Sequence, residues 1–274
     1  MGGQLSSEVV REKPYPKTDA TLYYFAGRGL ADQIRWLLAY SGVTFAGRVV
    51  DKRARFLKLA EAQLPFGQLP LLQIDGIELV QSQAIIRYLA KRASLLGTNA
   101  REEAVCDMIA ETIRDLIALI AGAPFARRRS AADGEEHIKL MKEKWLARAS
   151  RLEQGLKANG GQWFVGKSIT YADILMAHCL TWYVEEVRAA GTLTSHLLDI
   201  IIDNNSRKFP FLFLAANMQC GPGIVENMPR LVSLQNRIIE HPSLRGFIQG
   251  RQWYGLGQKE YCDHVDEVLG RTPE

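Results

Sequence analysis

The sequence is poor in cysteine, and its cysteines show no pattern. Four are present, and no two stand at the spacing of a metal site or of a CxxC motif: Cys106, Cys179, Cys220 and Cys262. Because the chain also shows no secretory signal, we expect reduced thiols in a cytoplasmic protein and no metal site. No apolar run reaches the roughly 18 residues that a membrane-spanning helix requires, so none is predicted.

A strong excess of either charge is missing as well. The 274 residues include 34 Lys and Arg and 30 Asp and Glu, a formal net charge of +4. The densest basic run, ARRRS at 126–130, is typical of a solvated loop or a helix end. A nucleic-acid partner therefore has little support. With 47% hydrophobic residues, the chain can form the core of one large or two small domains.

The N-terminal stretch MGGQLS matches the pattern for N-myristoylation, with Gly2 and Ser6 in the required positions. The alternative interpretation is a flexible leader over residues 1–20, because Pro14 and Pro16 favour an extended chain. A single acyl chain binds membranes only weakly, so we expect at most a weak membrane association.

The first folded segment is predicted to be a strand, a helix and a second strand. Residues 21–25 are β-formers, and apolar residues at helical spacing follow them. Polar residues separate these apolar positions: Asp32, Gln33 and Arg35. The SG at 41–42 ends the helix, and residues 44–50 can form the next strand. Such a unit places its two strands parallel.

A hairpin and a third helix complete an α/β domain over residues 21–96. Asp75-Gly76 lies between two apolar runs, which is a strong hairpin signal. Ser82 is predicted to cap the following helix. The buried stripe of this helix is predicted to contain Ile85, Ile86, Leu89 and Ala90.

The rest of the chain, residues 101–274, predicts an all-helical domain. One long helix is expected over 101–121, stopped by Pro124, and another over 134–157. Three further start signals are present: the capping box TYAD at 170–173 and first-turn prolines at Pro229 and Pro242.

Four motifs, taken together and in order, resemble the cytosolic glutathione transferases. They are YYFAGRG, LPFGQLPLLQIDG, LVQSQAIIRYLAK and WFVGKSITYADI. The chain looks most like the sigma class, which includes prostaglandin D synthases of the haematopoietic type. The resemblance implies a thioredoxin-like N-terminal domain, a helical C-terminal domain, glutathione as co-substrate and a homodimer.

The resemblance implies that Tyr24, directly before Phe in the first strand, is catalytic and is assisted by Arg28. Strand neighbours point to opposite faces, so only one of Tyr23 and Tyr24 can face the cleft, and Tyr23 is expected to pack inside. A free thiol with a pKa of about 8.5 is only a few per cent thiolate at neutral pH. A phenol that donates its O–H to the sulfur would favour the thiolate, as would a nearby guanidinium.

The resemblance implies four further positions that bind glutathione, in two pairs. Leu69-Pro70 matches the family's cis-proline turn, where backbone groups can pair with the cysteinyl part. Gln81 and Ser82 stand at a helix N-terminus, which suits the γ-glutamyl carboxylate.

The remaining implied contacts are less regular. Lys58 and Gln68 are candidates for the glycyl end of glutathione. Phe56 stands nearest to the position where the sigma class has Trp, and it lacks the indole N–H donor. Glu111 falls where the family has an acid that reaches the glutathione of the partner subunit, although the family's usual residue there is the shorter Asp.

The predicted activity is transfer of glutathione, activated by Tyr24, to small hydrophobic electrophiles. Two alternatives stay open: a glutathione-dependent prostaglandin isomerase, and a non-enzymatic ligand-binding or structural protein of the same fold. A thiol-disulfide enzyme is disfavoured, because no cysteine lies near the first strand–helix turn.

Residues 187–219 are predicted to be an atypical insertion. The segment contains LLDIII and FPFLFL, apolar runs without clear helical periodicity. Its removal would join WYVEE to CGPGIVENMPRL and restore a short connection between helices. It is either a genuine insertion that forms an extra helix over the substrate cleft or a translated intron, and sequencing of the mature transcript distinguishes the two.

Overall fold

The structure is a computed structural model that describes residues 19–189, 227–250 and 259–271. The proposed leader therefore lies almost wholly outside the described residues. The same holds for the proposed insertion at 187–219, apart from its first three residues.

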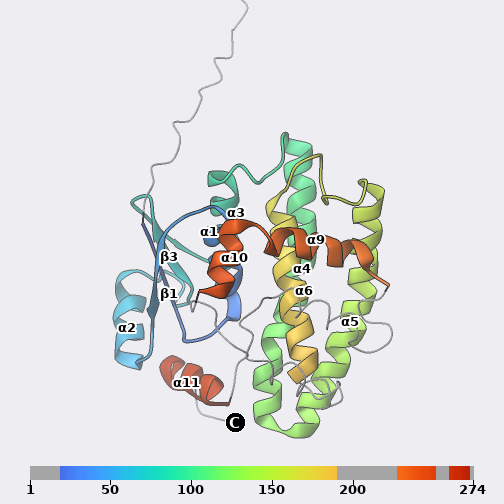
Figure 1. Ribbon diagram of the computed structural model, residues 1–274. Helices are drawn as coiled ribbons and strands as arrows, with labels where there is room; N and C mark the ends of the chain where they lie inside the picture. The colour runs from blue at the N-terminus through green and yellow to red at the C-terminus, as the bar shows by residue number, and fades with distance from the viewer. Residues whose placement is uncertain (1–18, 190–226, 251–258, 272–274) are drawn as a thin grey trace, which may run out of the picture.

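A four-stranded mixed sheet forms the centre of the N-terminal part. The strand order is β2-β1-β3-β4, with β1 parallel to β2 and antiparallel to β3. Its elements are β1 (Ala20–Tyr24), η1 (Gly29–Ala31), α1 (Asp32–Tyr40), β2 (Phe45–Val49), α2 (Arg53–Ala62), β3 (Leu71–Ile74), β4 (Ile77–Val80) and α3 (Ser82–Arg92). In Figure 1, α2 covers one side of the sheet, while α1 and α3 lie on the other. The predicted thioredoxin-like architecture is confirmed.

The hairpin between β3 and β4 is confirmed at the predicted turn. Asp75 and Gly76 have φ values of 51° and 77°, which are the left-handed values that a two-residue type I′ turn requires. The four residues predicted to form the apolar stripe of α3 are all buried: Ile85, Ile86, Leu89 and Ala90. Turn chemistry and periodicity therefore agree with the observed elements here.

The C-terminal part is entirely helical within the described residues. Its elements are α4 (Ala100–Arg129), α5 (Ala131–Ala158), α6 (Tyr171–Ala189), α9 (Pro229–Ile239), α10 (Pro242–Gln249) and α11 (Lys259–Leu269). Figure 1 shows α4, α5 and α6 side by side, with α11 close to α2 below the sheet. Over the described ranges, no helix is long and apolar enough to cross a membrane.

The expected stop of α4 at Pro124 is wrong. The helix continues through this buried proline to Arg129. The basic run at its end is held by carboxylates from three other helices: Arg127 binds Glu186 on α6, Arg128 binds Asp263 and Asp266 on α11, and Arg129 binds Asp133 on α5. Packing and ion pairs thus outweigh the one backbone hydrogen bond that a proline removes.

The expected cap of α3 by Ser82 is also wrong. Ser82 is the first helical residue, and the N-cap is Gln81, with φ of +68° and no side-chain cap hydrogen bond. The capping residues of α6, in contrast, lie where the sequence indicates. Asp173 accepts hydrogen bonds from the backbone N–H and the hydroxyl of Thr170.

Helix α1 is buried on more sides than its sequence pattern suggests. Its polar residues Asp32, Gln33 and Arg35 are all at most 5% exposed. The reason is that α1 contacts α3 within its own domain and also α6 and α10 of the helical domain. The polar side chains of α1, which in the sequence resemble a solvent-exposed face, therefore belong to the contact between the two domains.

Candidate active site

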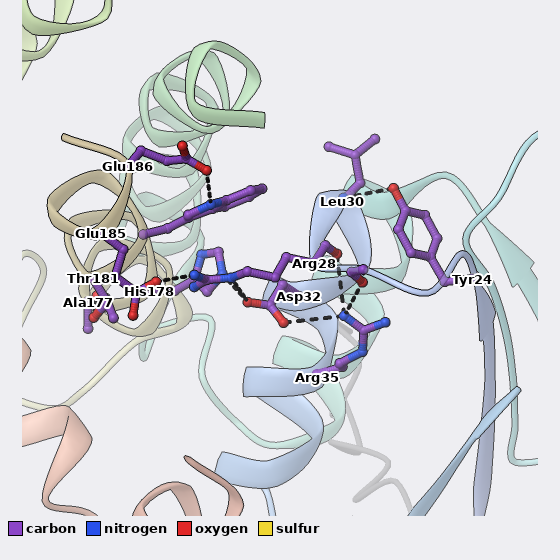
Figure 2. A network of polar contacts seen from close by, with 12 residues as sticks. Tyr24, Arg28, Leu30, Asp32, Arg35, Ala177, His178, Thr181, Glu185 and Glu186 are labelled. Carbon is purple, nitrogen blue, oxygen red and sulfur yellow. Dashed lines mark hydrogen bonds and ion pairs between the residues drawn. The ribbon is translucent and has the colours of Figure 1, made fainter. Parts of the chain in front are cut away.

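Tyr24 lies at the carboxyl end of β1, with 7% of its surface exposed. Its phenolic oxygen accepts a hydrogen bond from the backbone N–H of Leu30 at 3.0 Å, as Figure 2 shows. Tyr23 points to the other face of the strand, where it is half-buried against the core. Of the two tyrosines, only Tyr24 therefore reaches the turn between β1 and α1.

The surroundings of Tyr24 keep its phenol protonated near neutral pH. Burial raises the pKa of Tyr24 above its ordinary value, although the Leu30 N–H and the Arg35 guanidinium act in the opposite direction. Because the oxygen accepts from Leu30, the O–H of Tyr24 remains available to donate. A neutral phenol of this kind can donate to an anionic sulfur.

Gly29 provides the space that the Tyr24 hydroxyl occupies. A Cβ atom at this position would overlap that hydroxyl, and Gly29 has a φ of +42°. Glycine is therefore the residue that allows both the backbone turn and the close approach.

Arg28 is buried and bound to two carboxylates. Its Nε lies 3.0 Å from Asp32, and its Nη1 donates to Glu185 on α6. Its guanidinium also lies over the ring of Trp182, 4.9 Å from the centroid. Arg28 is thus tied to the helical domain, and it contacts the Tyr24 site through the backbone of its own loop.

A second arginine, Arg35, connects Asp32 to that loop. Its Nη1 donates to the carbonyl oxygens of Gly27 at 3.0 Å and Arg28 at 3.3 Å, and it lies 3.3 Å from Asp32 Oδ1. Its guanidinium lies 5.9 Å from the centroid of the Tyr24 ring. Figure 2 shows these groups converging on Asp32 between Arg28 and His178.

The residues implied to bind glutathione fall into two groups. At the start of α3, the side-chain amide of Gln81 donates to Gln68 Oε1 at 3.1 Å, so these two exposed residues are brought together beside Ser82. The Leu69-Pro70 peptide bond is cis, and both residues precede β3.

The other predicted contacts lie on the helices α2 and α4. Lys58 is exposed on α2, whereas the neighbouring Phe56 is 7% exposed and belongs to the hydrophobic core. Glu111 on α4 lies 2.6 Å from Arg87 and 2.8 Å from Arg114. Its carboxylate is therefore already engaged within its own chain.

Several residues around Tyr24 were missed by sequence reasoning. Tyr261 on α11 packs so closely on Gly27 that a Cβ there would overlap its ring. The others are charged or polar groups of the domain contact: Asp32, Arg35, His178 and Glu185. No local pattern marks them, since His178 is 146 positions from its partner Asp32. No group of His, Cys, Asp and Glu suited to a metal ion exists among the described residues.

Comparison with known proteins gives consistent matches along the chain. The family model "Glutathione S-transferase, N-terminal domain" matches residues 20–91, and "Glutathione S-transferase, C-terminal domain" matches residues 114–200. Glutathione S-transferase alpha-4 of Rattus norvegicus is 39% identical over 251 residues, which cover 90% of this chain and 96% of the relative.

Two solved structures show the same fold. The structure titled "rat hPGDS complexed with a quinoline" aligns with a TM-score of 0.62 and 25% identity, covering 87% of this chain and 100% of the other. The monomeric Na-GST-3 of the hookworm Necator americanus aligns with a TM-score of 0.64 and 24% identity, again covering 87% and 100%. The relative from Rattus norvegicus found by sequence is an alpha-class enzyme, whereas the rat structure is of the prostaglandin synthase type, so the sigma-like class is not confirmed.

Proposed function

The chain belongs to the glutathione S-transferase family, and on that premise we propose that Tyr24 activates glutathione for conjugation to small hydrophobic electrophiles. The enzyme is a transferase and glutathione is its co-substrate, as in the family. The observation that carries the proposed role is the geometry of Tyr24: a buried phenol that accepts from Leu30 and keeps its own O–H to donate.

The proposed step is stabilisation of a thiolate. To lower the pKa of the glutathione thiol by about two units requires roughly 2.7 kcal/mol in favour of the charged form. A charge-assisted hydrogen bond from Tyr24 supplies much of this, and the cation of Arg35 near the ring adds to it. The thiolate then forms a C–S bond to the electrophile, which releases its leaving group as an anion, and the proton of the thiol leaves to solvent.

For Arg28 we propose a positioning role. Its guanidinium is bound by Asp32 and Glu185, so its contribution is to hold the loop before α1 at a fixed distance from the helical domain. This differs from a direct contact with the sulfur.

The start of α3 is the proposed site for the γ-glutamyl carboxylate. The first turn of α3 has no side-chain cap, so its backbone N–H groups and the Ser82 hydroxyl can bind an anion. Gln68 and Gln81, which contact each other there, would orient it. Leu69 before β3 is proposed to pair with the cysteinyl part.

At the glycyl end, Lys58 is the proposed partner of the carboxylate because it is exposed and cationic. Phe56 would support this region from the core rather than bind directly, since only 7% of its surface is exposed.

A homodimer is the proposed assembly. Among the described residues, the most exposed large apolar side chains are Phe66, 65% exposed before β3, and Met108, 63% exposed on α4. A second copy of this chain would cover them. For Glu111 to reach the glutathione of the partner subunit, it would first have to leave Arg87 or Arg114.

Isomerisation is the second candidate, favoured by the structural similarity to the rat hPGDS. In an isomerase, glutathione returns unchanged, whereas conjugation consumes one thiol for each product. Titration of free thiol during turnover of a prostaglandin endoperoxide separates the two activities.

The test of the proposed function compares Tyr24→Phe with Tyr23→Phe in conjugation of glutathione to a generic aromatic electrophile. Loss of the Tyr24 donor should lower kcat/KM by up to about 50-fold at pH 6.5, because a return of the thiol pKa from about 6.5 to about 8.5 reduces the thiolate fraction from one half to about one per cent. Turnover should recover at high pH, and glutathione binding should change little. Tyr23→Phe, on the other face of β1, should behave like the wild type, and unchanged turnover of Tyr24→Phe at pH 6.5 would contradict the proposal.

A further inference from the structure

A buried histidine of the helical domain ends a chain of hydrogen bonds that begins beside Tyr24. His178 on α6 is fully buried, and its Nε2 lies 3.0 Å from Oδ2 of Asp32 on α1. We propose that His178 is a positioning residue for the thiol-activating site, acting through Asp32 and Arg35. This inference rests on the proposed role of Tyr24.

The protonation of this pair follows from its surroundings. Burial alone would raise the pKa of Asp32, but Arg28, His178 and Arg35 hold it well below its usual range. An ionised carboxylate only accepts, so Nε2 of His178 must donate. Burial lowers the pKa of His178, and its Nδ1 has no hydrogen-bond partner among the described residues. His178 is therefore a neutral ring with one fixed donor.

The ring has little freedom to turn. Trp36 on α1 and Trp182 on α6 meet it edge-on, with centroids at 5.2 Å and 5.8 Å. The other charged groups near it are the two arginines named above and, further along α6, Glu185 and Glu186, which bind Arg28 and Arg127. None of these can replace the Nε2–H donor to Asp32 from the same direction.

Asp32 connects His178 to Arg35 through its two carboxylate oxygens. Its Oδ2 receives both His178 and Arg28, which leaves Oδ1 directed at Arg35. Arg35 in turn holds the Gly27 and Arg28 carbonyl oxygens and lies over the Tyr24 ring. Without the histidine donor, Asp32 can rotate, and Arg35 loses one of the contacts that fix it beside Tyr24. The helical domain would thus tune the site without touching glutathione.

The experiment measures the apparent pKa of the bound glutathione thiol, by thiolate absorbance without electrophile, together with the pH profile of kcat/KM. In His178→Leu we expect this pKa to rise by roughly half to one unit from about 6.5, which lowers the thiolate fraction and kcat/KM about two- to fivefold at pH 6.5. In His178→Gln, whose amide nitrogen can reach the Nε2 position, the thiol pKa should stay within about 0.2 unit of the wild-type value. In His178→Asn, whose shorter side chain places its amide nitrogen nearer the Nδ1 position, the thiol pKa should rise as in His178→Leu.

His137→Leu is the matched control, because the Nε2 of His137 on α5 bonds an oxygen of another helix, the carbonyl oxygen of Leu119 on α4 at 2.7 Å, rather than Asp32. It should lower thermal stability and leave the thiol pKa unchanged. If His178→Leu does not fold, the Gln and Asn variants decide. Folded His178→Asn or His178→Leu with a wild-type thiol pKa would overturn the inference. Because this readout needs only bound glutathione, it stays valid even if the wild type conjugates no tested electrophile.

Discussion

At the scale of single residues, Gly29 sets the position of the Tyr24 hydroxyl, because any Cβ there overlaps it. We expect Gly29→Ala to displace the phenol and to lower kcat/KM at neutral pH by about tenfold or more, since the donor distance to the sulfur changes. Because the backbone has a positive φ at this position, alanine should also lower the free energy of unfolding by about 1–2 kcal/mol. Steady-state kinetics and urea unfolding measure the two effects.

The control for this prediction is Gly155→Ala on α5, where an added Cβ meets no atom within 4 Å. Alanine should stabilise this helix by roughly 0.5–1 kcal/mol and leave the kinetics unchanged. A Gly29→Ala enzyme with wild-type kinetics would show that the Tyr24 hydroxyl does not need this space.

At the residue level, strand alternation correctly separates Tyr23 and Tyr24 onto opposite faces of β1, whereas the catalytic role of Tyr24 stays a prediction. Sequence reasoning could not find the groups behind Tyr24. Asp32 and Arg35 sit in α1 among apolar residues, in a pattern that also describes a solvent face. Their burial depends on His178 and Glu185, which lie on a helix far along the chain. Such long-range pairing leaves no local periodicity to read.

At the scale of elements, the start of α6 depends on one carboxylate. Asp173 is fully buried and accepts from the backbone N–H of Phe164 at 2.8 Å and from the N–H and hydroxyl of Thr170 at 2.7 and 2.8 Å. We expect Asp173→Ala to lower the free energy of unfolding by about 2–4 kcal/mol, because it leaves buried donors without partners. Urea unfolding followed by circular dichroism measures this.

A matched position in α5 provides the comparison. Asp133 is also the third residue of its helix, but its carboxylate is exposed and pairs only with Arg129 at 3.1 Å. Asp133→Ala should therefore cost less than about 1 kcal/mol. Equal losses in the two variants would show that burial of the carboxylate is not what matters at α6.

Element boundaries were predicted well where backbone geometry decides them and poorly where packing does. The turn at Asp75-Gly76 and the starts of α9 and α10 at proline follow from local chemistry. Pro124 was expected to stop α4, because a proline costs about 3 kcal/mol inside an isolated helix. The ion pairs and contacts of α4 with α5, α6 and α11 are nonlocal and reverse that outcome.

At the scale of the whole molecule, we expect a dimer in solution. Sedimentation at micromolar concentration should give about twice the 30.7 kDa of one chain. Phe66→Ser should shift the protein toward monomer, because Phe66 is the most exposed large apolar side chain described. Leu57→Ser, a 50% exposed position on α2, is the control and should leave the mass unchanged. A wild-type monomer, the state named for the hookworm Na-GST-3, would contradict the dimer.

The contact between the domains should also make stability depend on pH. The pKa of His178 is lowered in the fold by burial, so below the unfolded value of about 6.5 the unfolded chain takes up a proton that the fold does not. Stability is therefore lost as pH falls through that value. From pH 7 to 5.5, the wild type should lose about 1 kcal/mol more than His178→Gln, which cannot titrate.

Other titrating groups do not obscure this comparison. Asp173, whose pKa is raised to about 6 by burial, and Asp32 are present in both proteins. Where the substitution leaves their pKa values unchanged, their contributions to the pH dependence of the free energy of unfolding cancel in the difference. Urea unfolding at pH 7, 6.5, 6 and 5.5 measures it. Parallel curves for the two proteins would show that folding does not lower the pKa of His178.

The long separation between Asp32 and His178 also matters during protein synthesis. A ribosome adds roughly 5–20 residues per second, so about 7 to 30 seconds pass between the appearance of these two partners, which are 146 residues apart. During that interval Arg28, Asp32 and Arg35 lack their covering helix and can remain hydrated. The nascent N-terminal segment then presents charges at this place, where a purely hydrophobic domain contact would present a surface for chaperones or for aggregation.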